Sequence, residues 1–408
     1  MPLKIKDNIK ITNNIGKIFL NKNTSKKNHS KIFKIIDKIK NDIDIKDNPL
    51  HFFSKQFQSY NNKKELNKFK KFKTIIVVGM GGSILGLEAI YSFLKLKINK
   101  EVIFLDNLDT NKINRIFKKN ILKNSLFILI SKSGNTIETL INVNILGKKN
   151  ISKNNTIIIT ERKNNALKKF SDDKNILFIE HKKNIGGRYS VLSEVGMVPA
   201  YILGLNPQKF KFEIKKFLKK KSNNTLIDNA EKNSQLYLNK KINSIVFLNY
   251  HSSLNGFIFW LQQLLSESLG KKEKGLLPTI SPAPKDHHSL LQLYLDGPKD
   301  KVFYIFSVKE TNDKKMTNNF FYNKFKYLKN KKISDIINSQ KEALLKVFKQ
   351  KNIPYKEIYI NKVSEKTLGE LFGFFMLETV IVAELINVNP YNQPAVEGVK
   401  LFTKQALN

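Results

Sequence analysis

From residue 74 to residue 179, short runs of apolar residues alternate with longer stretches in which apolar positions recur at helical spacing. The short runs predict buried strands, and the stretches between them, such as residues 84–96 and 137–146, predict helices. Strands that alternate with helices in this way are typical of a parallel, doubly wound sheet. The predicted strands cover residues 74–78, 101–105, 125–130, 156–159 and 175–179.

The same plan returns loosely in the second half of the chain. Strands are predicted at residues 245–250, 302–306 and 355–360, and a long helix is predicted over 364–386. We therefore expect an α/β fold with two doubly wound parallel-sheet domains, each a three-layer αβα arrangement. The expected parts are a helical N-terminal segment (1–70), a first domain (71–207), a helical connector (208–240) and a second domain with a C-terminal helix (241–408).

Composition narrows the class of protein. The chain has 408 residues, of which 41% are hydrophobic, and this suits two or three globular domains. It contains no cysteine, which excludes disulfides, thiolate nucleophiles and cysteine-based zinc sites. The N-terminus lacks the apolar centre of a signal peptide, and charged residues interrupt every apolar stretch before it could span a membrane. We expect a soluble cytoplasmic protein with no membrane partner.

The net charge of +38 raises the question of nucleic-acid binding. The basic residues are almost all lysines spread along the whole chain, and arginine occurs only at positions 115, 162 and 188. Proteins that recognise nucleic acids usually use arginine for bidentate contacts, and no zinc finger, RNA-recognition signature or basic heptad helix is present. We expect weak polyanion binding in low salt and no specific nucleic-acid partner.

A turn rich in hydroxyl groups follows the predicted strand 125–130. Ser131, Lys132, Ser133 and Thr136 lie between this strand and the helix that begins at Ile137. Backbone N–H groups and the helix dipole favour an anion at such a turn, and the hydroxyls and the ammonium add donors on several sides. The pattern predicts a phosphate site. A hydroxyl-rich N-cap with no ligand is the alternative.

Two glycine turns carry further candidates. Gly82 and Ser83 follow the strand 74–78 in a Gly-Met-Gly-Gly-Ser segment that matches neither a dinucleotide fingerprint nor a Walker loop. Its glycines allow a ligand to approach the backbone closely, or they allow tight packing of helix against sheet. Gly187 and Arg188 lie in a second turn, where a planar cation suits an oxyanion or a phosphate. An ion pair between Arg188 and a nearby acid such as Glu194 is the alternative.

Gln263 and Glu267 are four residues apart and share one face of a predicted helix. Glu267 lies near the end of this helix, where the dipole disfavours a negative charge and would raise the pKa of the carboxyl group. A carboxylate with a raised pKa is suited to proton abstraction near neutral pH. A solvated glutamate beside Lys271 and Lys272 is the alternative.

Two histidines and the C-terminal segment complete the candidate residues. His287 and His288 are adjacent and therefore point in different directions, and no third ligand follows at metal spacing, so we expect no metal site. A histidine in a polar loop can transfer protons near pH 7. Gln393 and Lys400 belong to the C-terminal segment, with Lys400 on a short final helix.

From about residue 74 to residue 400, these segments occur in the order found in the phosphoglucose isomerase (glucose-6-phosphate isomerase) family, which the chain resembles. The resemblance rests on the Gly-Gly-Ser turn, the Ser-Lys-Ser turn that ends in Glu-Thr, Gly-Gly-Arg-Tyr-Ser, the glutamate helix, the histidine loop and the Gln-x-x-x-Glu-x-x-Lys tail. It implies two α/β domains of the sugar-isomerase (SIS) type. It also implies reversible conversion of D-glucose 6-phosphate to D-fructose 6-phosphate in glycolysis and gluconeogenesis, without a cofactor.

The resemblance further implies a role for each matching residue. Glu267 would move a proton between C2 and C1 through a cis-enediol(ate), and Arg188 would stabilise the negative charge of that intermediate. His288, supplied by the partner subunit of a homodimer, and Lys400 would assist ring opening. Binding of the sugar phosphate would fall to two sets of residues: Ser83, Ser131, Lys132, Ser133 and Thr136 for the phosphate, and Gly82, Gly187, Gln263 and Gln393 for the rest of the substrate.

Three alternatives remain open at this point. A phosphosugar isomerase that acts on mannose 6-phosphate, or on both epimers, would use most of the same residues. An aminosugar isomerase of the same fold would not account for Glu267 and the tail with Gln393 and Lys400. A non-catalytic regulator that binds sugar phosphates could keep the hydroxyl turn but would not need Glu267, Arg188, His288 and Lys400 together. His287 could share the role given to His288.

Overall fold

A computed structural model describes residues 4–5, 8–16, 19–60, 62–118, 121–147, 149–211, 214–219, 225–311, 313–317 and 323–408. The first sheet has five parallel strands in the order β4-β3-β5-β6-β7. Every residue of the two strands β5 and β6 is buried, because helices cover both faces of the sheet. The strands are β3 (Thr74–Val78), β4 (Glu101–Leu105), β5 (Ser125–Ile130), β6 (Thr156–Thr160) and β7 (Leu177–Glu180).

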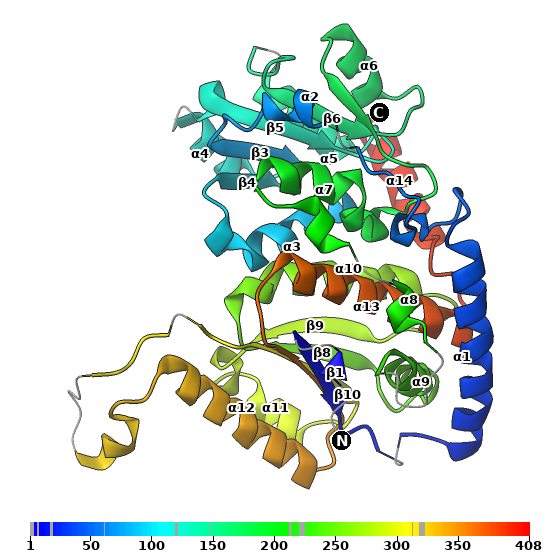
Figure 1. Ribbon diagram of the computed structural model, residues 1–408, viewed down its shortest axis with the longest axis vertical. Helices are drawn as coiled ribbons and strands as arrows, with labels where there is room; N and C mark the ends of the chain where they lie inside the picture. Colours follow the sequence, from blue (N-terminus) through cyan, green and yellow to red (C-terminus); the bar gives the residue numbers. More distant parts are fainter. Residues whose placement is uncertain are drawn as a thin grey trace.

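Helices pack on the two faces of this sheet. Apolar residues of α4 (Thr110–Lys118), α5 (Ile137–Leu146) and α6 (Ala166–Asp173) form one hydrophobic cluster with one set of strand residues. The other face joins the main core through α3 (Leu85–Phe93) and α7 (Glu194–Ile202). The short helix α2 (Lys63–Asn67) precedes the first strand. This unit therefore has the three-layer arrangement predicted from the sequence (Figure 1).

The second sheet has six strands in the order β1-β2-β11-β10-β8-β9. Its central strands are parallel, and β2 pairs antiparallel with both β11 and β1. The strands are β1 (Lys4–Ile5), β2 (Ile9–Asn13), β8 (Ser244–Asn249), β9 (Leu277–Pro282), β10 (Lys301–Val308) and β11 (Tyr355–Ile360). The α/β fold class with two parallel-stranded units is confirmed.

Helices of the second unit also lie on both faces of its sheet. Two of them, α10 (Asn255–Leu269) and α13 (Glu365–Leu385), lie between the two sheets, and α10 packs on α3 of the first unit (Figure 1). Trp260, Phe257 and Phe372 make ring contacts in this central layer. The far face carries α11 (Leu291–Asp296) and α12 (Ile333–Gln350). The connector contains α8 (Ile214–Phe217) and α9 (Thr225–Leu238).

The N-terminal segment contains helices, as predicted, and also two strands that were not predicted. The helix α1 (Lys22–Asp42) is present, but β1 and β2 precede it. Ile9 and Ile11 alternate with polar neighbours and are 2% and 3% exposed, which is the two-residue period of a strand. Because β2 pairs along β11, it covers an edge that the parallel strands alone would leave open.

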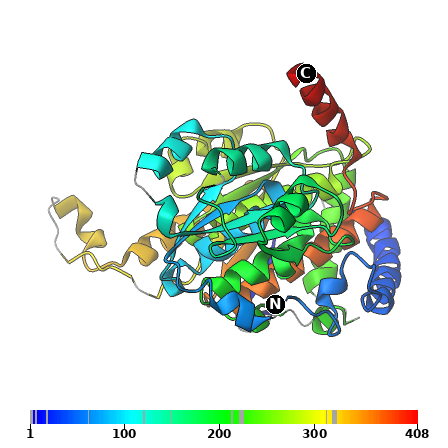
Figure 2. The same cartoon turned by 90° about the horizontal axis from the view of Figure 1, so that it is seen from above.

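Smaller differences concern single elements. The helix predicted over 84–96 ends earlier, at Phe93. The edge strand β9 was not predicted, because Pro278 and Pro282 lie within it and proline is unfavourable in most strand positions. The final helix was predicted correctly: α14 (Glu397–Leu407) contains no buried residue and projects from the body of the molecule (Figure 2). Among the described helices, none has the length and apolar character needed to cross a membrane.

Candidate active site

Three hydroxyl groups converge in the turn between β5 and α5. The Oγ of Ser131 lies 2.8 Å from Oγ1 of Thr136 and 3.5 Å from Oγ of Ser133. The Oγ of Ser133 lies 3.4 Å from Oγ1 of Thr136. The backbone N–H of Gly134 donates to Ser131 at 3.1 Å. A β-carbon at Gly134, whose φ is 69°, would lie 1.8 Å from Oδ1 of Asn165, so the turn requires glycine there. The hydroxyls predicted to hold a phosphate therefore lie together at the N-terminus of α5.

Lys132 in the same turn makes backbone contacts. Its ammonium group donates to the carbonyl oxygens of Lys183 and Ile185, both at 2.9 Å, and lies 3.8 Å from a carboxylate oxygen of Glu161. Burial lowers the pKa of Lys132. The side chain thus ties the hydroxyl turn to the segment that precedes Gly187, and its predicted contact with a phosphate stays a prediction.

The two glycine turns touch each other. A β-carbon at Gly82 would lie 2.2 Å from the carbonyl carbon of Gly187 and 2.5 Å from the backbone nitrogen of Arg188. The hydroxyl of Ser190 donates to the carbonyl of Gly82 at 3.3 Å. Ser83 is buried at the end of this first turn. Glycine at position 82 therefore allows the backbone that carries Arg188 to approach the carboxyl end of β3.

Arg188 is the centre of a hydrogen-bond network. Its side chain is 1% exposed, and Nη1 lies 2.9 Å from Oε2 of Glu267. Nε donates to Ser268 at 2.8 Å, and Nη1 also donates to the side-chain oxygen of Gln393. Nη2 donates to the carbonyl oxygens of Pro390 and Asn392, at 2.5 and 3.1 Å. All five N–H donors of the guanidinium group are therefore in use.

Glu267 is held on both carboxylate oxygens. Arg188 binds Oε2, and Nε2 of Gln263 donates to Oε1 at 2.9 Å, as expected for two residues on one helix face. The side chain of Glu267 is nevertheless 30% exposed, so part of the carboxylate can be reached from solvent. Within the described part of the chain, the buried side-chain oxygen of Gln263 has no hydrogen-bond partner. A buried acceptor of this kind suits a ligand hydroxyl.

The acid that pairs with Arg188 is not the one named from the sequence. Arg188 pairs with Glu267 and not with Glu194, which is buried on α7 and has a pKa raised by burial. Lys271 and Lys272 do not pair with Glu267 either. Their ammonium groups donate to backbone carbonyls, among them that of Asn389 at 2.6 Å from Lys271. Burial and the nearby charge of Arg188 lower the pKa of Lys271 to about 8.

Lys400 lies outside this network. Gln393 reaches Arg188, but the side chain of Lys400 is 63% exposed, and the contact found for it among the described residues is an ion pair with Glu397 at 2.7 Å. Its helix α14 projects away from the molecule (Figure 2). The single chain does not bring Lys400 to Glu267.

The histidine loop is also separate from the Arg188 network. His288 is exposed, whereas His287 is half-buried and its Nε2 lies 2.7 Å from the hydroxyl of Tyr250. Burial and the neighbouring His288 lower the pKa of His287. The two histidines therefore differ in environment, and the exposed one is His288. Nowhere in the described residues do three or more acidic or histidine side chains form a group that could hold a metal ion.

Three residues of the network were not predicted from the sequence. Ser268 accepts from Nε of Arg188 and lies 3.0 Å from the hydroxyl of Tyr189. Trp260, the only tryptophan of the chain, donates from Nε1 to the backbone carbonyl of Arg188 at 3.1 Å. Tyr189 and Ser268 are sequence neighbours of the two predicted residues, but their contact joins positions far apart in the chain, so no local pattern indicates it.

Comparison with known proteins gives concordant results. The family model described as phosphoglucose isomerase matches residues 23–408. The glucose-6-phosphate isomerase of Methanocaldococcus jannaschii is 35% identical over 349 residues, covering 82% of this chain and 85% of the relative. That of Campylobacter jejuni is 30% identical over 351 residues, covering 82% and 86%.

Solved structures agree in fold. The crystal structure of a hypothetical protein from Thermus thermophilus has a TM-score of 0.83 at 21% identity and covers 97% of this chain and 99% of that one. A glucose-6-phosphate isomerase from Chlamydia trachomatis has a TM-score of 0.78 at 17% identity, covering 98% and 88%.

Proposed function

The chain belongs to the phosphoglucose isomerase family, and from this membership we propose that it interconverts D-glucose 6-phosphate and D-fructose 6-phosphate in the cytoplasm, as a step of glycolysis and gluconeogenesis. The observation that carries the proposal is the Glu267–Arg188 pair, at 2.9 Å, next to the glycine turn of Gly82. A base, a cation and a phosphate anchor suffice for this reaction, because the carbonyl of the substrate already acidifies the neighbouring C–H. The reaction needs no cofactor.

The hydroxyl turn is the proposed phosphate site. Ser131, Ser133 and Thr136 place three hydroxyls within 3.5 Å of one another at the N-terminus of α5, where the helix dipole and backbone N–H groups favour an anion. Lys132 adds a positive charge, and Ser83 lies in the neighbouring turn. Binding the phosphate here would hold the reacting carbons in place, so that their position depends on the rigid carboxyl edge of the first sheet.

Glu267 is the proposed base. A carboxylate oxygen would take the proton from C2 of the open-chain aldose while negative charge develops on the C1 oxygen. The resulting cis-enediol(ate) would take a proton from Glu267 at C1, and transfer of the proton on the C2 oxygen to the C1 oxygen would give the ketose. Arg188, a permanent cation 2.9 Å from Glu267, would stabilise the enediolate charge. The unpartnered oxygen of Gln263 and the amide of Gln393 would orient the sugar hydroxyls.

Ring opening would precede proton transfer. We assign this step to His288 and Lys400, and we propose that His288 comes from the partner subunit of a homodimer. The exposure of both side chains in the single chain supports this assignment, because residues that act across a subunit interface have to be reachable from outside their own subunit.

The test is turnover of fructose 6-phosphate, with the glucose 6-phosphate formed measured by its oxidation. The wild type is compared with Glu267→Gln and with Glu342→Gln, a matched change at an exposed position of α12. We expect the wild type and Glu342→Gln to be equally active and Glu267→Gln to lose activity by several orders of magnitude. If Glu267→Gln keeps its activity, Glu267 is not the base. If the wild type is inactive, the proposed reaction is wrong.

A further inference from the structure

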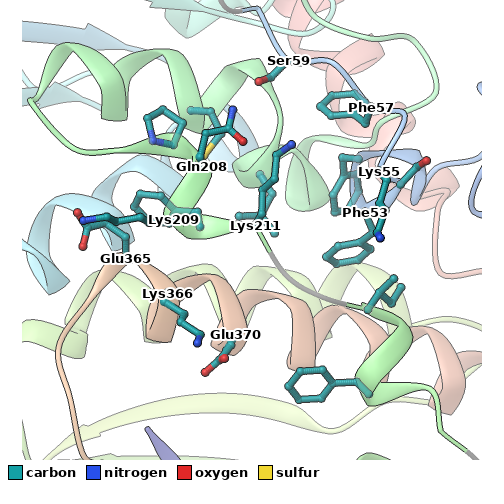
Figure 3. Close-up of a pocket in the computed structure, with 18 of the residues that line it drawn as sticks. Phe53, Lys55, Phe57, Ser59, Gln208, Lys209, Lys211, Glu365, Lys366 and Glu370 are labelled. Carbon is teal, nitrogen blue, oxygen red and sulfur yellow. The ribbon is translucent and has the colours of Figure 1, made fainter. Parts of the chain in front are cut away.

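A second cavity lies outside the site described above. It has a volume of about 1740 Å³, and none of the predicted site residues lines it. Most of its lining comes from four parts of the chain that are distant in the sequence: residues 43–59, residues 192–197, the described residues of 207–211 and 214–219, and residues 362–370. Asn8, Lys97, Thr225 and Leu226 complete the lining, and Figure 3 shows part of it. Sites for small ligands commonly measure roughly 300–1,000 Å³, so this cavity has room for a large metabolite.

The cavity is lined by more lysines than acids. Seven lysines and three acidic residues belong to its walls. Lys97 is paired with Glu365 at 2.8 Å, and Asp44 accepts a hydrogen bond from Ser54. Five of the lysines have no ion pair within the described part of the chain: Lys55, Lys209, Lys211, Lys362 and Lys366.

These lysines belong to different segments that face one cavity. Figure 3 shows Lys211 extending between the wall that carries Gln208 and the wall that carries Phe53 and Phe57. Lysines that outnumber the acidic residues around one cavity attract an anion, and the attraction grows with the number of negative charges on the anion. The arrangement therefore favours a polyanion over a single carboxylate.

One wall of the cavity carries Phe52, Phe53 and Phe57, and Phe210 and Phe217 line the cavity from another segment. Phe57 is half-buried, so part of its side chain is accessible. Phe57 is held edge-on against His51, with ring centroids 5.8 Å apart. A flat heterocycle can stack on such a ring while its charged groups reach the lysines. Inorganic phosphate alone would leave this wall uncovered.

We propose that this cavity binds a nucleoside polyphosphate, with the base against the phenylalanine wall and the phosphates among Lys55, Lys211 and Lys362. The three lysines belong to three different segments that line the cavity. The site is independent of the hydroxyl turn at α5, and a ligand here does not compete with a sugar phosphate. This inference does not depend on the isomerase activity.

The experiment is a calorimetric titration of the full chain with ATP, without added metal and at an ionic strength of about 0.15 M. An excess of fructose 6-phosphate is present to occupy the hydroxyl turn. The test variant is Lys55→Glu/Lys211→Glu. The control is Lys169→Glu/Lys346→Glu, which makes the same change of charge at exposed positions of α6 and α12 that do not line the cavity.

We expect ATP to bind the wild type and the control variant with similar Kd values below about 1 mM, and the test variant at least about tenfold more weakly. Adenosine and inorganic triphosphate should each bind more weakly than ATP, and Phe57→Ala should reduce the difference between ATP and triphosphate.

Three results would overturn the proposal. Equal weakening in both double variants would show general attraction to the +38 chain. If triphosphate binds as tightly as ATP, the aromatic wall does not contribute to binding. If ATP at millimolar concentration does not bind to the wild type, the cavity is not a nucleotide site.

Discussion

Replacing Arg188 by lysine keeps the charge but removes the planar fork, and it should destabilise the protein strongly. The guanidinium group uses five N–H donors, whereas an ammonium group has three, so at least two hydrogen bonds are lost. Each hydrogen bond to a charged group is worth about 1.5–3 kcal/mol, so the free energy of unfolding should fall by about 3–6 kcal/mol. This is a large part of the roughly 5–15 kcal/mol that stabilises a typical protein.

Urea unfolding followed by tryptophan fluorescence measures this loss directly. Trp260 is the only tryptophan, is buried, and donates to the backbone carbonyl of Arg188, so its emission reports on the network itself. Arg115→Lys is the matched control, because Arg115 is exposed on α4 and its replacement should change stability by less than about 0.5 kcal/mol. If Arg188→Lys is no less stable than Arg115→Lys, the network does not hold the C-terminal segment to the glutamate helix.

Three further predictions concern single residues. Ser131→Ala should raise the KM for fructose 6-phosphate by about 10- to 100-fold with the fold retained, because one hydroxyl donor to the phosphate is lost; an unchanged KM would place the phosphate elsewhere. Lys400→Ala should lower kcat while the urea midpoint stays constant, since the side chain is 63% exposed; equal loss of activity and stability would indicate a structural role. His181 is buried, and burial lowers its pKa from 6.5 to about 4, so the unfolded chain binds the additional proton first and stability should fall as the pH drops from 6.5 to 4. His181→Gln should flatten the dependence of stability on pH between 6.5 and 4. If the variant and the wild type show the same dependence, His181 is not its cause.

The sequence predicts the first unit better than the ends of the chain. The strands 74–78, 101–105 and 125–130 have the predicted bounds. The strand 125–130 is buried throughout and 74–78 nearly so, and strands buried on both faces leave continuous apolar runs. The short alternation of Ile9 and Ile11 is a weaker signal, and its meaning depends on β11, more than 300 residues later. A strand of this kind is determined by its partner more than by its own composition.

In the candidate site, too, contacts within one local segment could be predicted and contacts between distant segments could not. The hydroxyls of Ser131, Ser133 and Thr136 lie together because they belong to one local turn. The partner of Arg188 could not be read from its surroundings, since Glu194 is closer in sequence than Glu267 and the structure pairs it with Glu267. The roles of His288 and Lys400 stay predictions, because both side chains are exposed and the single chain does not bring them to Glu267.

In the proposed reaction, Glu267 carries a proton between C2 and C1 of a sugar phosphate held by the hydroxyl turn. NMR of glucose 6-phosphate and fructose 6-phosphate incubated with the protein in D₂O tests this proton transfer. We predict that the wild type introduces deuterium at C2 of glucose 6-phosphate as it isomerises, whereas Glu267→Gln introduces none over the same time. Isomerisation without any deuterium at C2 would contradict proton exchange at this base, and deuterium introduced equally fast by Glu267→Gln would show that another residue is the base.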